Sequence, residues 1–155
     1  MYTIGLVCSG NICRSPTADV VLTALVAEAG LSDRVRVVSS GTGDWHVGEP
    51  MDHRSAATLR EAGYDPSRHR AQQLDASWFD HDLLLVMDRA NLTAVRRLGG
   101  DAGNVRLFRD FDPVDPGGEV PDPYYGGEDG FAEVLAIVER TSTALVADLA
   151  DQLRD

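Results

Sequence analysis

Residues 2–16 read YTIGLVCSGNICRSP, an apolar run that leads through a short polar stretch into a Ser-Pro pair. The run from Tyr2 to Cys8 is almost continuously apolar, which is typical of a strand buried on both faces of a sheet. A helix is predicted to follow from Ser15 to Gly30, because Ser15 can cap its first turn, a proline fits there, and Gly30 can end it. A strand, a tight loop and a helix in this order form the opening unit of an α/β fold.

The alternation of strands and helices continues along the chain. Further strands are expected at Arg34–Ser39, Leu83–Met87 and Asn104–Phe108. Further helices are expected at Asp52–Ala62, Arg89–Leu98 and Gly130–Leu153, and a single helical turn at Asp75–Phe79. Residues 109–130 are expected to form a loop rich in Asp, Pro and Gly. Such alternation predicts a parallel sheet covered by helices on both faces. The length of 155 residues suits a single domain spanning residues 1–155.

The composition argues against several classes of function. The chain has 14 basic residues, all of them Arg, and 25 acidic residues, so its formal net charge is −11. This charge disfavours non-specific binding to nucleic acid or to an anionic membrane surface, and no apolar run approaches the length of a membrane span. Residues 1–7 have neither the basic start nor the length of a signal peptide. Two cysteines argue against a disulfide framework, so the sequence predicts a cytoplasmic enzyme.

The loop after the first strand has the features of an anion-binding site. Cys8 stands at the carboxyl end of a strand, where parallel α/β sheets bind their ligands. Gly10 permits backbone angles that turn successive N–H groups inward, and the start of the next helix adds its positive dipole end. Arg14 supplies a planar fork that can hold two oxygens of a phosphate. The stretch therefore predicts a cradle for a tetrahedral oxyanion and for a phosphoryl group in transfer.

Cys8 would lie at the floor of this cradle. The N–H groups, the helix dipole and Arg14 should favour its thiolate, and a thiolate that faces phosphorus can attack it in line and form a thiophosphate. Asn11 and Ser15 are placed to hold the shape of the loop and to donate to the sulfur. A buried structural cysteine would be the commoner explanation of Cys8 by itself, but the full string between a strand and a helix is far more specific.

The string VCSGNICRSP resembles the signature of the low-molecular-weight protein tyrosine phosphatases, which carry C-x5-R-S near the N-terminus and an Asp-Pro-Tyr-Tyr segment late in the chain. That segment is residues 122–125 here. The resemblance covers essentially the whole chain and implies a four-stranded parallel sheet with helices on both sides. It also implies hydrolysis of phosphotyrosine in proteins through a cysteinyl-phosphate, with no metal or cofactor, and inhibition by phosphate-like oxyanions. The implied phosphate-binding loop comprises Ser9, Gly10, Asn11, Ile12, Cys13, Arg14 and Ser15. Position 9 is Ser where the family more often has Leu or Thr, and that residue is expected to offer mainly its backbone.

The resemblance assigns catalysis to Cys8, Arg14 and Asp122. Asp122 would protonate the leaving phenolate and then activate the water that hydrolyses the thiophosphate, while a proline on each side stiffens its backbone. Taken alone, the segment VPDPYYGG (120–127) would be no more than a turn-rich loop. Three acidic residues lie nearby, Asp110, Asp112 and Asp115. The stretch that contains them lacks the required Gly and the distal Glu of a calcium-binding loop, so they are expected to be solvated turn residues.

An aryl phosphate requires a deep slot with apolar and aromatic walls. Trp45 lies in a Gly-rich loop that faces the catalytic loop in the family, although a plain packing role for this residue is the alternative. A related branch of the family that acts on phosphoarginine has Thr at the position of Ile12, so Ile12 favours phosphotyrosine. The candidate walls are Ile12, Trp45, His46, Tyr124 and Tyr125.

Two residues outside the loop are expected to support it. His69 matches a family histidine that hydrogen-bonds the Asn of the catalytic loop, here Asn11, and an ordinary surface histidine is the alternative. Asp88 follows the third strand. It is expected to orient Arg14 or the Asp122 loop, or to cap the helix that comes next.

The two cysteines and Asp122 also help to distinguish a phosphatase from an arsenate reductase and from a non-catalytic phosphate-binding module. Cys13 is a poor candidate for the nucleophile, and family precedent suggests a protective disulfide with Cys8 under oxidation, the alternative being a small apolar filler. Thiol-dependent arsenate reductases share this fold and loop but need further cysteines, and none follows Cys13. A non-catalytic phosphate-binding module would be expected to lose Cys8 or Asp122 while it keeps Arg14. The sequence thus favours hydrolysis of tyrosine-phosphorylated proteins.

Overall fold

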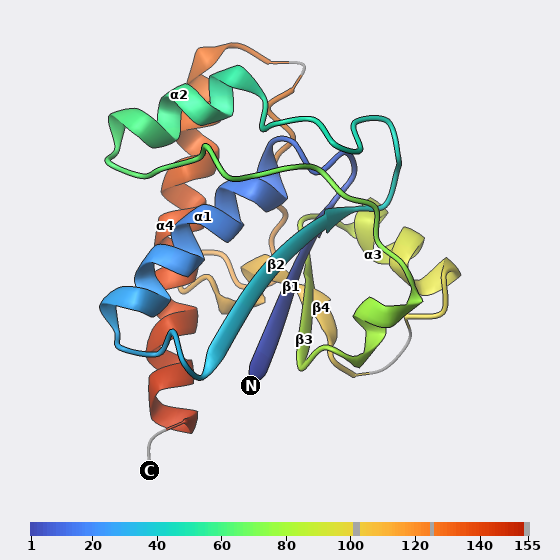
Figure 1. Cartoon of the computed structure of the whole chain (residues 1–155), viewed down its shortest axis with the longest axis vertical. Coiled ribbons are helices and arrows are strands. Elements are labelled where there is room, and N and C mark those ends of the chain that lie inside the picture. Colours follow the sequence, from blue (N-terminus) through green and yellow to red (C-terminus); the bar gives the residue numbers. More distant parts are fainter. Residues whose placement is uncertain (101–102, 125, 154–155) are drawn as a thin grey trace.

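The structure is a computed structural model that describes residues 1–100, 103–124 and 126–153 (Figure 1). Within these residues the strands are β1 (Tyr2–Cys8), β2 (Val35–Gly41), β3 (Leu83–Val86) and β4 (Val105–Leu107). The α-helices are α1 (Arg14–Glu28), α2 (His53–Glu61), α3 (Arg89–Arg97) and α4 (Glu128–Gln152). Two short 3-10 helices are η1 (Ala76–Asp80) and η2 (Phe108–Phe111).

The strands run parallel in the order β2-β1-β3-β4, which confirms the predicted α/β fold with a four-stranded parallel sheet. β1 and β2 pair along their whole length, from Tyr2 with Val35 to Cys8 with Gly41. The chain first extends the sheet on one side of β1 and then places β3 on the other side. The strand order therefore reverses between β1 and β3, and the crevice beyond their carboxyl ends is where such sheets bind ligands.

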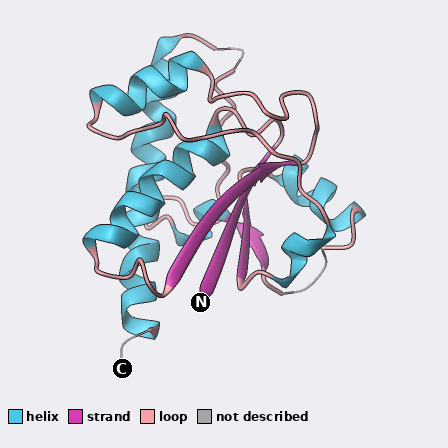
Figure 2. Ribbon diagram, in the orientation of Figure 1, coloured by secondary structure: helices cyan, strands magenta, loops and turns pink. Residues whose placement is uncertain are grey.

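Helices cover both faces of the sheet (Figure 2). α1, α2 and α4 lie together over one face, and α3 and η1 lie over the other. β1 is buried on both faces because its side chains alternate: Ile4 and Leu6 enter the core beside α1 and α4, whereas Val7 enters the core beside α3. This double burial explains the almost continuous apolar run of β1. In the part of the chain that the structure describes, no helix is both long and apolar enough to cross a membrane.

The start of α1 differs from the expected one. The sequence suggests Ser15 as the cap, but α1 begins at Arg14, and Cys13 before it makes no capping hydrogen bond with its side chain. The Ser15 hydroxyl oxygen instead lies 3.0 Å from Cys8 Sγ and 3.3 Å from the carbonyl oxygen of Ser40. This hydroxyl therefore builds the loop between β1 and α1, and that use is incompatible with capping the helix.

The segment expected as a loop at 109–130 is anchored to α4 by a buried ion pair. Asp112, expected to be a solvated turn residue, is only 1% exposed. It accepts hydrogen bonds from Arg140 Nε at 2.8 Å, Arg140 Nη2 at 2.9 Å, Arg109 Nε at 2.9 Å and the Val114 N–H at 2.9 Å. The bonds from Arg140, with those from Val114 and Arg109, outweigh burial and hold the pKa of Asp112 well below its usual range. The expectation of a solvated residue was wrong because its partner Arg140 lies 28 positions away and was not apparent from local sequence.

We expect Asp112→Asn to lower the free energy of unfolding by about 3 kcal/mol at neutral pH, because two guanidinium groups then lose a buried anion. A carboxyl whose pKa is depressed in the folded state stabilises the protein above its unfolded pKa of about 4, and this contribution is lost as the pH falls through the folded value. The difference between parent and variant should therefore shrink below about pH 4. Urea denaturation at several pH values measures both effects.

Asp110→Asn is the matched control, because Asp110 pairs with Arg106 at 3.4 Å on the partly exposed surface of the same segment. Its loss should change stability by less than about 1 kcal/mol. Equal destabilisation by the two substitutions would contradict the buried ion pair as the anchor of this segment.

Candidate active site

A cavity of about 470 Å³ opens beyond the carboxyl ends of β1 and β3, in the crevice that the strand order creates. Its floor is the loop between β1 and α1, and its sides come from the segments after β2 and before α4. All the residues that line it are among those predicted from the sequence: Cys8, Ser9, Gly10, Ile12, Cys13, Arg14, Trp45, His46, Asp122 and Tyr124. The other predicted residues do not line the cavity but hydrogen-bond to residues that do or to one another: Asn11, Ser15, His69 and Asp88. Tyr125 lies outside the described residues.

The shape of the loop depends on Asn11, which is fully buried and has a φ of +58°. Left-handed backbone costs a non-glycine residue about 1 kcal/mol or more, and the Asn11 side chain offsets this cost with hydrogen bonds. Nδ2 donates to Ser15 Oγ at 2.8 Å and to Ser39 Oγ at 3.1 Å, and Oδ1 accepts from the Gln72 N–H at 3.0 Å. His69 Nε2 donates to the Asn11 carbonyl oxygen at 2.6 Å, so the expected contact between these two residues is present. Burial lowers the pKa of His69, which leaves a neutral ring with its proton on Nε2.

Two donors converge on the sulfur of Cys8, a side chain that is only 3% exposed at the floor of the cavity. The Asn11 N–H lies 3.3 Å from Sγ, and Ser15 Oγ lies 3.0 Å from it. Ser15 Oγ accepts from Asn11 Nδ2, and its one proton can be donated either to the Ser40 carbonyl oxygen at 3.3 Å or to the sulfur, which as a thiolate can only accept. Both donors stabilise negative charge on Sγ, which is the state that a nucleophilic cysteine requires.

Arg14 is charged and yet almost fully buried, with 3% of the side chain exposed. Its Nη1 donates to Asp88 Oδ2 at 2.6 Å and to the Val120 carbonyl oxygen at 3.1 Å, and its Nη2 lies 3.6 Å from Asp122 Oδ2. Burial disfavours the charge, but Cys8, Asp88 and Asp122 more than compensate and raise the pKa of Arg14. The guanidinium is thus fixed by one carboxylate, while its other edge faces the cavity.

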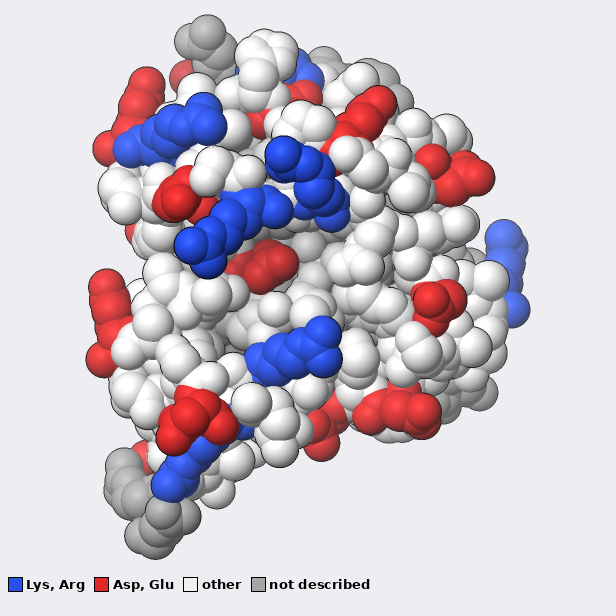
Figure 3. All heavy atoms as spheres, viewed as in Figure 1, with Lys and Arg blue, Asp and Glu red and all other residues white. Residues whose placement is uncertain are grey.

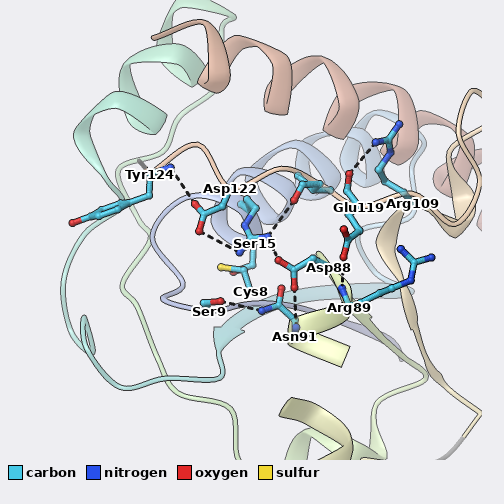
Figure 4. A network of polar contacts seen from close by, with 12 residues as sticks. Cys8, Ser9, Ser15, Asp88, Arg89, Asn91, Arg109, Glu119, Asp122 and Tyr124 are labelled. Atoms are coloured by element: carbon cyan, nitrogen blue, oxygen red, sulfur yellow. Dashed lines mark hydrogen bonds and ion pairs between the residues drawn. The ribbon is translucent and has the colours of Figure 1, made fainter. Parts of the chain in front are cut away.

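The start of α3 supports the loop through two side chains. Asp88 accepts from the Asn91 N–H at 2.8 Å, so it caps α3 and orients Arg14 at the same time. Asn91 is itself 1% exposed and donates from Nδ2 to Ser9 Oγ at 3.1 Å (Figure 4). Ser9 therefore contributes its side chain as well as its backbone, contrary to expectation. Sequence reasoning missed Asn91, because no local motif marks a partner 82 positions away.

Asp122 lies across the mouth of the cavity from Cys8 (Figure 4). Its side chain is 42% exposed, with Oδ1 accepting from the Tyr124 N–H at 3.0 Å and Oδ2 facing Arg14. The segment before it is fixed to the sheet, because the Val120 N–H donates to the Met87 carbonyl oxygen at 2.8 Å. A carboxyl group held in this way can exchange protons with solvent and with a group inside the cavity.

Aromatic side chains form the outer walls of the cavity. Trp45 is 68% exposed and Tyr124 is 38% exposed. The ring of His46 lies 6.4 Å from that of Tyr124, and Glu49 Oε2 lies 2.7 Å from His46 Nδ1. Trp45 is exposed beside the cavity while its ring also packs over Gly43, so its role as a wall stays a prediction. Ile12 supplies the apolar part of the floor.

The second cysteine of the loop differs from the first. Both thiols are free, and burial raises the pKa of Cys13 to about 12. Cys13 therefore stays protonated at neutral pH and is a poor nucleophile. It packs in a small apolar cluster with Ile12, Ala71 and Phe131. The disulfide between Cys8 and Cys13 stays a prediction. Within the described residues, no three His, Cys, Asp or Glu side chains are grouped to hold a metal ion.

Known proteins match this chain over nearly its whole length. Residues 3–155 match the family model for low molecular weight phosphotyrosine protein phosphatases. The low molecular weight protein-tyrosine-phosphatase of Streptomyces coelicolor is 48% identical, over 98% of this chain and 96% of the relative. The low molecular weight protein-tyrosine phosphatase A of Mycobacterium tuberculosis is 45% identical, over 88% of this chain and 84% of the relative.

Solved structures agree with the sequence matches. The protein tyrosine phosphatase of Entamoeba histolytica, crystallised with Hepes in its active site, has a TM-score of 0.92 and 30% identity, and the match covers 98% of this chain and 99% of that one. YfkJ of Bacillus subtilis also has a TM-score of 0.92, with 29% identity over 99% of this chain and 98% of that one. On these matches, the chain belongs to the low molecular weight phosphotyrosine protein phosphatase family.

Proposed function

We propose that the protein hydrolyses phosphotyrosine in proteins through a cysteinyl-phosphate intermediate. The observation that carries the proposal is the meeting of Cys8, Arg14 and Asp122 in one cavity with aromatic walls. These residues supply a nucleophile, a positive charge for the phosphoryl oxygens and a proton donor. They come from segments that lie more than a hundred residues apart in the chain.

In the first step Cys8 Sγ attacks phosphorus. The S–P bond forms while the bond between phosphorus and the tyrosine oxygen breaks, and Asp122 gives its proton to that oxygen. The equatorial oxygens gain negative charge during transfer, and Arg14 Nη2 together with the inward N–H groups of the loop stabilises them. This positive field belongs to the protein itself, so the step needs no metal ion.

In the second step Asp122, now a carboxylate, takes a proton from a water molecule. The oxygen of that water attacks phosphorus, the S–P bond breaks, and the electron pair returns to Sγ as thiolate. Ser15 and the Asn11 N–H then stabilise the sulfur as leaving group, because both lie within hydrogen-bonding distance of it. One carboxyl group therefore serves both steps, and inorganic phosphate leaves the loop.

The walls of the cavity support an aryl substrate. Trp45, His46 and Tyr124 flank the entrance, and the nucleophile lies at the floor. A flat ring can enter between such walls and carry its phosphate down to the sulfur, whereas a serine phosphate is too short to fill the slot. Ile12 at the floor supports phosphotyrosine over phosphoarginine.

Two other functions remain alternatives. An arsenate reductase of this fold would need further cysteines to carry the oxidation onward, and none follows Cys13 in the sequence. A non-catalytic phosphate-binding module would not need a carboxyl group opposite a cysteine. The presence of both Cys8 and Asp122 supports hydrolysis.

Tyrosine-phosphorylated proteins are the proposed partners, and phosphate-like oxyanions are the proposed inhibitors because they fit the same loop. Acidic and basic side chains are interspersed on the face shown in Figure 3, which with the net charge of −11 gives no support for a nucleic-acid partner. We place the activity in the cytoplasm, where the two free thiols would stay reduced.

The first prediction concerns the nucleophile and the acid. With EDTA present, Cys8→Ser should abolish hydrolysis of para-nitrophenyl phosphate, a loss of roughly 10⁴-fold or more. Asp122→Asn should lower kcat/KM for phenyl phosphate by roughly 10²-fold or more. The loss should be smaller for dinitrophenyl phosphate, whose leaving group needs no proton. Steady-state kinetics across a series of aryl phosphates measures this dependence.

Asp115→Asn is the control, because Asp115 is a 61% exposed carboxylate in the same segment. It should leave the kinetics unchanged. An inactive parent that still binds phosphate would refute the proposed hydrolysis, and a thiol-coupled arsenate assay would then separate the reductase from the binding module.

The second prediction concerns the aromatic wall. Trp45→Ala should raise KM for a phosphotyrosine peptide about tenfold, or about 1.4 kcal/mol. The inhibition constant of inorganic phosphate should not change, because phosphate contacts only the loop. Val47→Ala is the control: Val47 is 57% exposed in the same segment but does not line the cavity. If Trp45→Ala weakened phosphate and peptide equally, Trp45 would be acting on the loop and not on the ring of the substrate.

A further inference from the structure

Arg54 does not line the cavity, but it contacts the segment that carries Asp122, the proposed general acid. Arg54 lies in the first turn of α2 and is about one-third exposed. Its Nη2 donates to the Tyr124 carbonyl oxygen at 3.1 Å, across 70 positions of sequence. Its guanidinium carbon also lies 5.4 Å from the centre of the Tyr124 ring and 4.7 Å from that of Phe131. One side chain thus holds both the backbone and the ring of Tyr124.

Arg54 is itself fixed by the carboxylate of Asp52, the residue that caps α2. Asp52 Oδ1 accepts from Arg54 Nε at 3.2 Å and Asp52 Oδ2 accepts from Arg54 Nη2 at 3.1 Å. Burial opposes the charge of Asp52, but the bonds from Arg54 outweigh it and lower the pKa of this carboxyl. The N–H of Asp52 donates to the Ile12 carbonyl oxygen at 2.9 Å. Asp52 therefore joins Arg54 to the phosphate-binding loop.

The contacts that begin at Ile12 and pass through Asp52, Arg54 and Tyr124 end at Asp122, the proposed proton donor. The N–H of Tyr124 donates to Asp122 Oδ1 at 3.0 Å, which orients the carboxyl group (Figure 4). Asp122 is thus held on two sides. Before it, Val120 is bonded to Arg14 and Met87, and after it, contacts run from Tyr124 through Arg54 and Asp52 to Ile12. The nearest direct contact between Asp122 and the loop is longer, at 3.6 Å from Arg14 Nη2.

We propose that Arg54 is a positioning residue for the general acid, because it sets the distance and orientation of Asp122 relative to the phosphate-binding loop. The proposal rests on the proposed hydrolysis and deepens it. Arg54 acts through Tyr124 and does not touch the reacting atoms. Arginine is required, because a lysine has no planar fork to bind Asp52 and the Tyr124 carbonyl together while its face lies over two rings.

The kinetic test uses Arg54→Gln and Arg54→Lys in the full chain, with aryl phosphates of graded leaving-group acidity. Both variants should lower kcat/KM for phenyl phosphate by roughly 10- to 100-fold, because small displacements of a catalytic group cost this much. The loss should fade for dinitrophenyl phosphate. In a background of Asp122→Asn, Arg54→Gln should cost no more than about twofold, because the group that it positions is already disabled.

Arg60→Gln is the matched control. Arg60 lies in the last turn of the same helix and is exposed to solvent. This variant should keep the parent's kinetics on all substrates. A loss in Arg54→Gln that is equal for every leaving group, and that persists in the Asp122→Asn background, would overturn the proposal and leave Arg54 with a purely structural role.

A second measurement separates this proposal from the proposed hydrolysis. Hydrogen exchange of the Tyr124 amide, which donates to Asp122 Oδ1, should be faster in Arg54→Gln than in the parent, and unchanged in Arg60→Gln. Unchanged exchange in Arg54→Gln would refute the positioning role even if the enzyme is active. Faster exchange in a chain that hydrolyses no aryl phosphate would refute the function and leave the positioning of this segment standing.

Discussion

The buried ion pair between Arg14 and Asp88 is the interaction on which the rest of the site depends. Arg14 begins α1 directly after the loop that follows β1, and Asp88 follows β3 as the cap of α3, so their 2.6 Å contact joins the two sides of the crevice where the strand order reverses. An unpaired guanidinium in this position would cost several kcal/mol. Asp88 removes that cost and, because it also caps α3, is itself fixed. The looser approach of Asp122, at 3.6 Å, leaves Nη2 free to turn to a phosphoryl oxygen when one enters.

A second constraint is the left-handed backbone of Asn11. This conformation turns one N–H toward Cys8 and depends on polar partners in two other segments of the chain, Ser39 in β2 and both His69 and Gln72 in the loop after α2. The strain is tolerable because each of the Asn11 side-chain atoms has a partner. A fully satisfied buried network of this kind specifies one geometry, whereas a partly satisfied one would cost more than an apolar core. The sulfur of Cys8 is therefore positioned with the help of residues that do not line the cavity.

The sequence was sufficient for the fold and for the residues that line the cavity, because both are local signals. An apolar strand, a glycine, an arginine and a helix start lie within fifteen residues, and Asp122 lies in a short segment that the family shares. The features that could not be predicted are side-chain contacts between residues that lie far apart in the sequence. The contacts of Asn91 with Ser9 and of Arg54 with Tyr124 join residues that are 82 and 70 positions apart. The burial of Asp112 likewise depends on Arg140, which is 28 positions away. Ser15 was predicted both to cap the helix and to contact the sulfur, and only the contact with the sulfur is found, because α1 begins one residue earlier.

The net charge of −11 raises the question of how this chain attracts a dianion. A charge 10 Å away in water contributes about 0.4 kcal/mol, which salt reduces to roughly 0.1 kcal/mol at physiological ionic strength. Eleven such charges together oppose binding by roughly 1 kcal/mol. A guanidinium 4 Å from the phosphate at an effective dielectric constant of about 20 contributes about 4 kcal/mol in the opposite direction. Arg14 therefore offsets the charge of the whole surface, although the paired carboxylate of Asp88 cancels part of this attraction and leaves the rest to the N–H donors of the loop. The acidic surface then acts chiefly on the rate at which anionic substrates approach, and that effect weakens as salt is added.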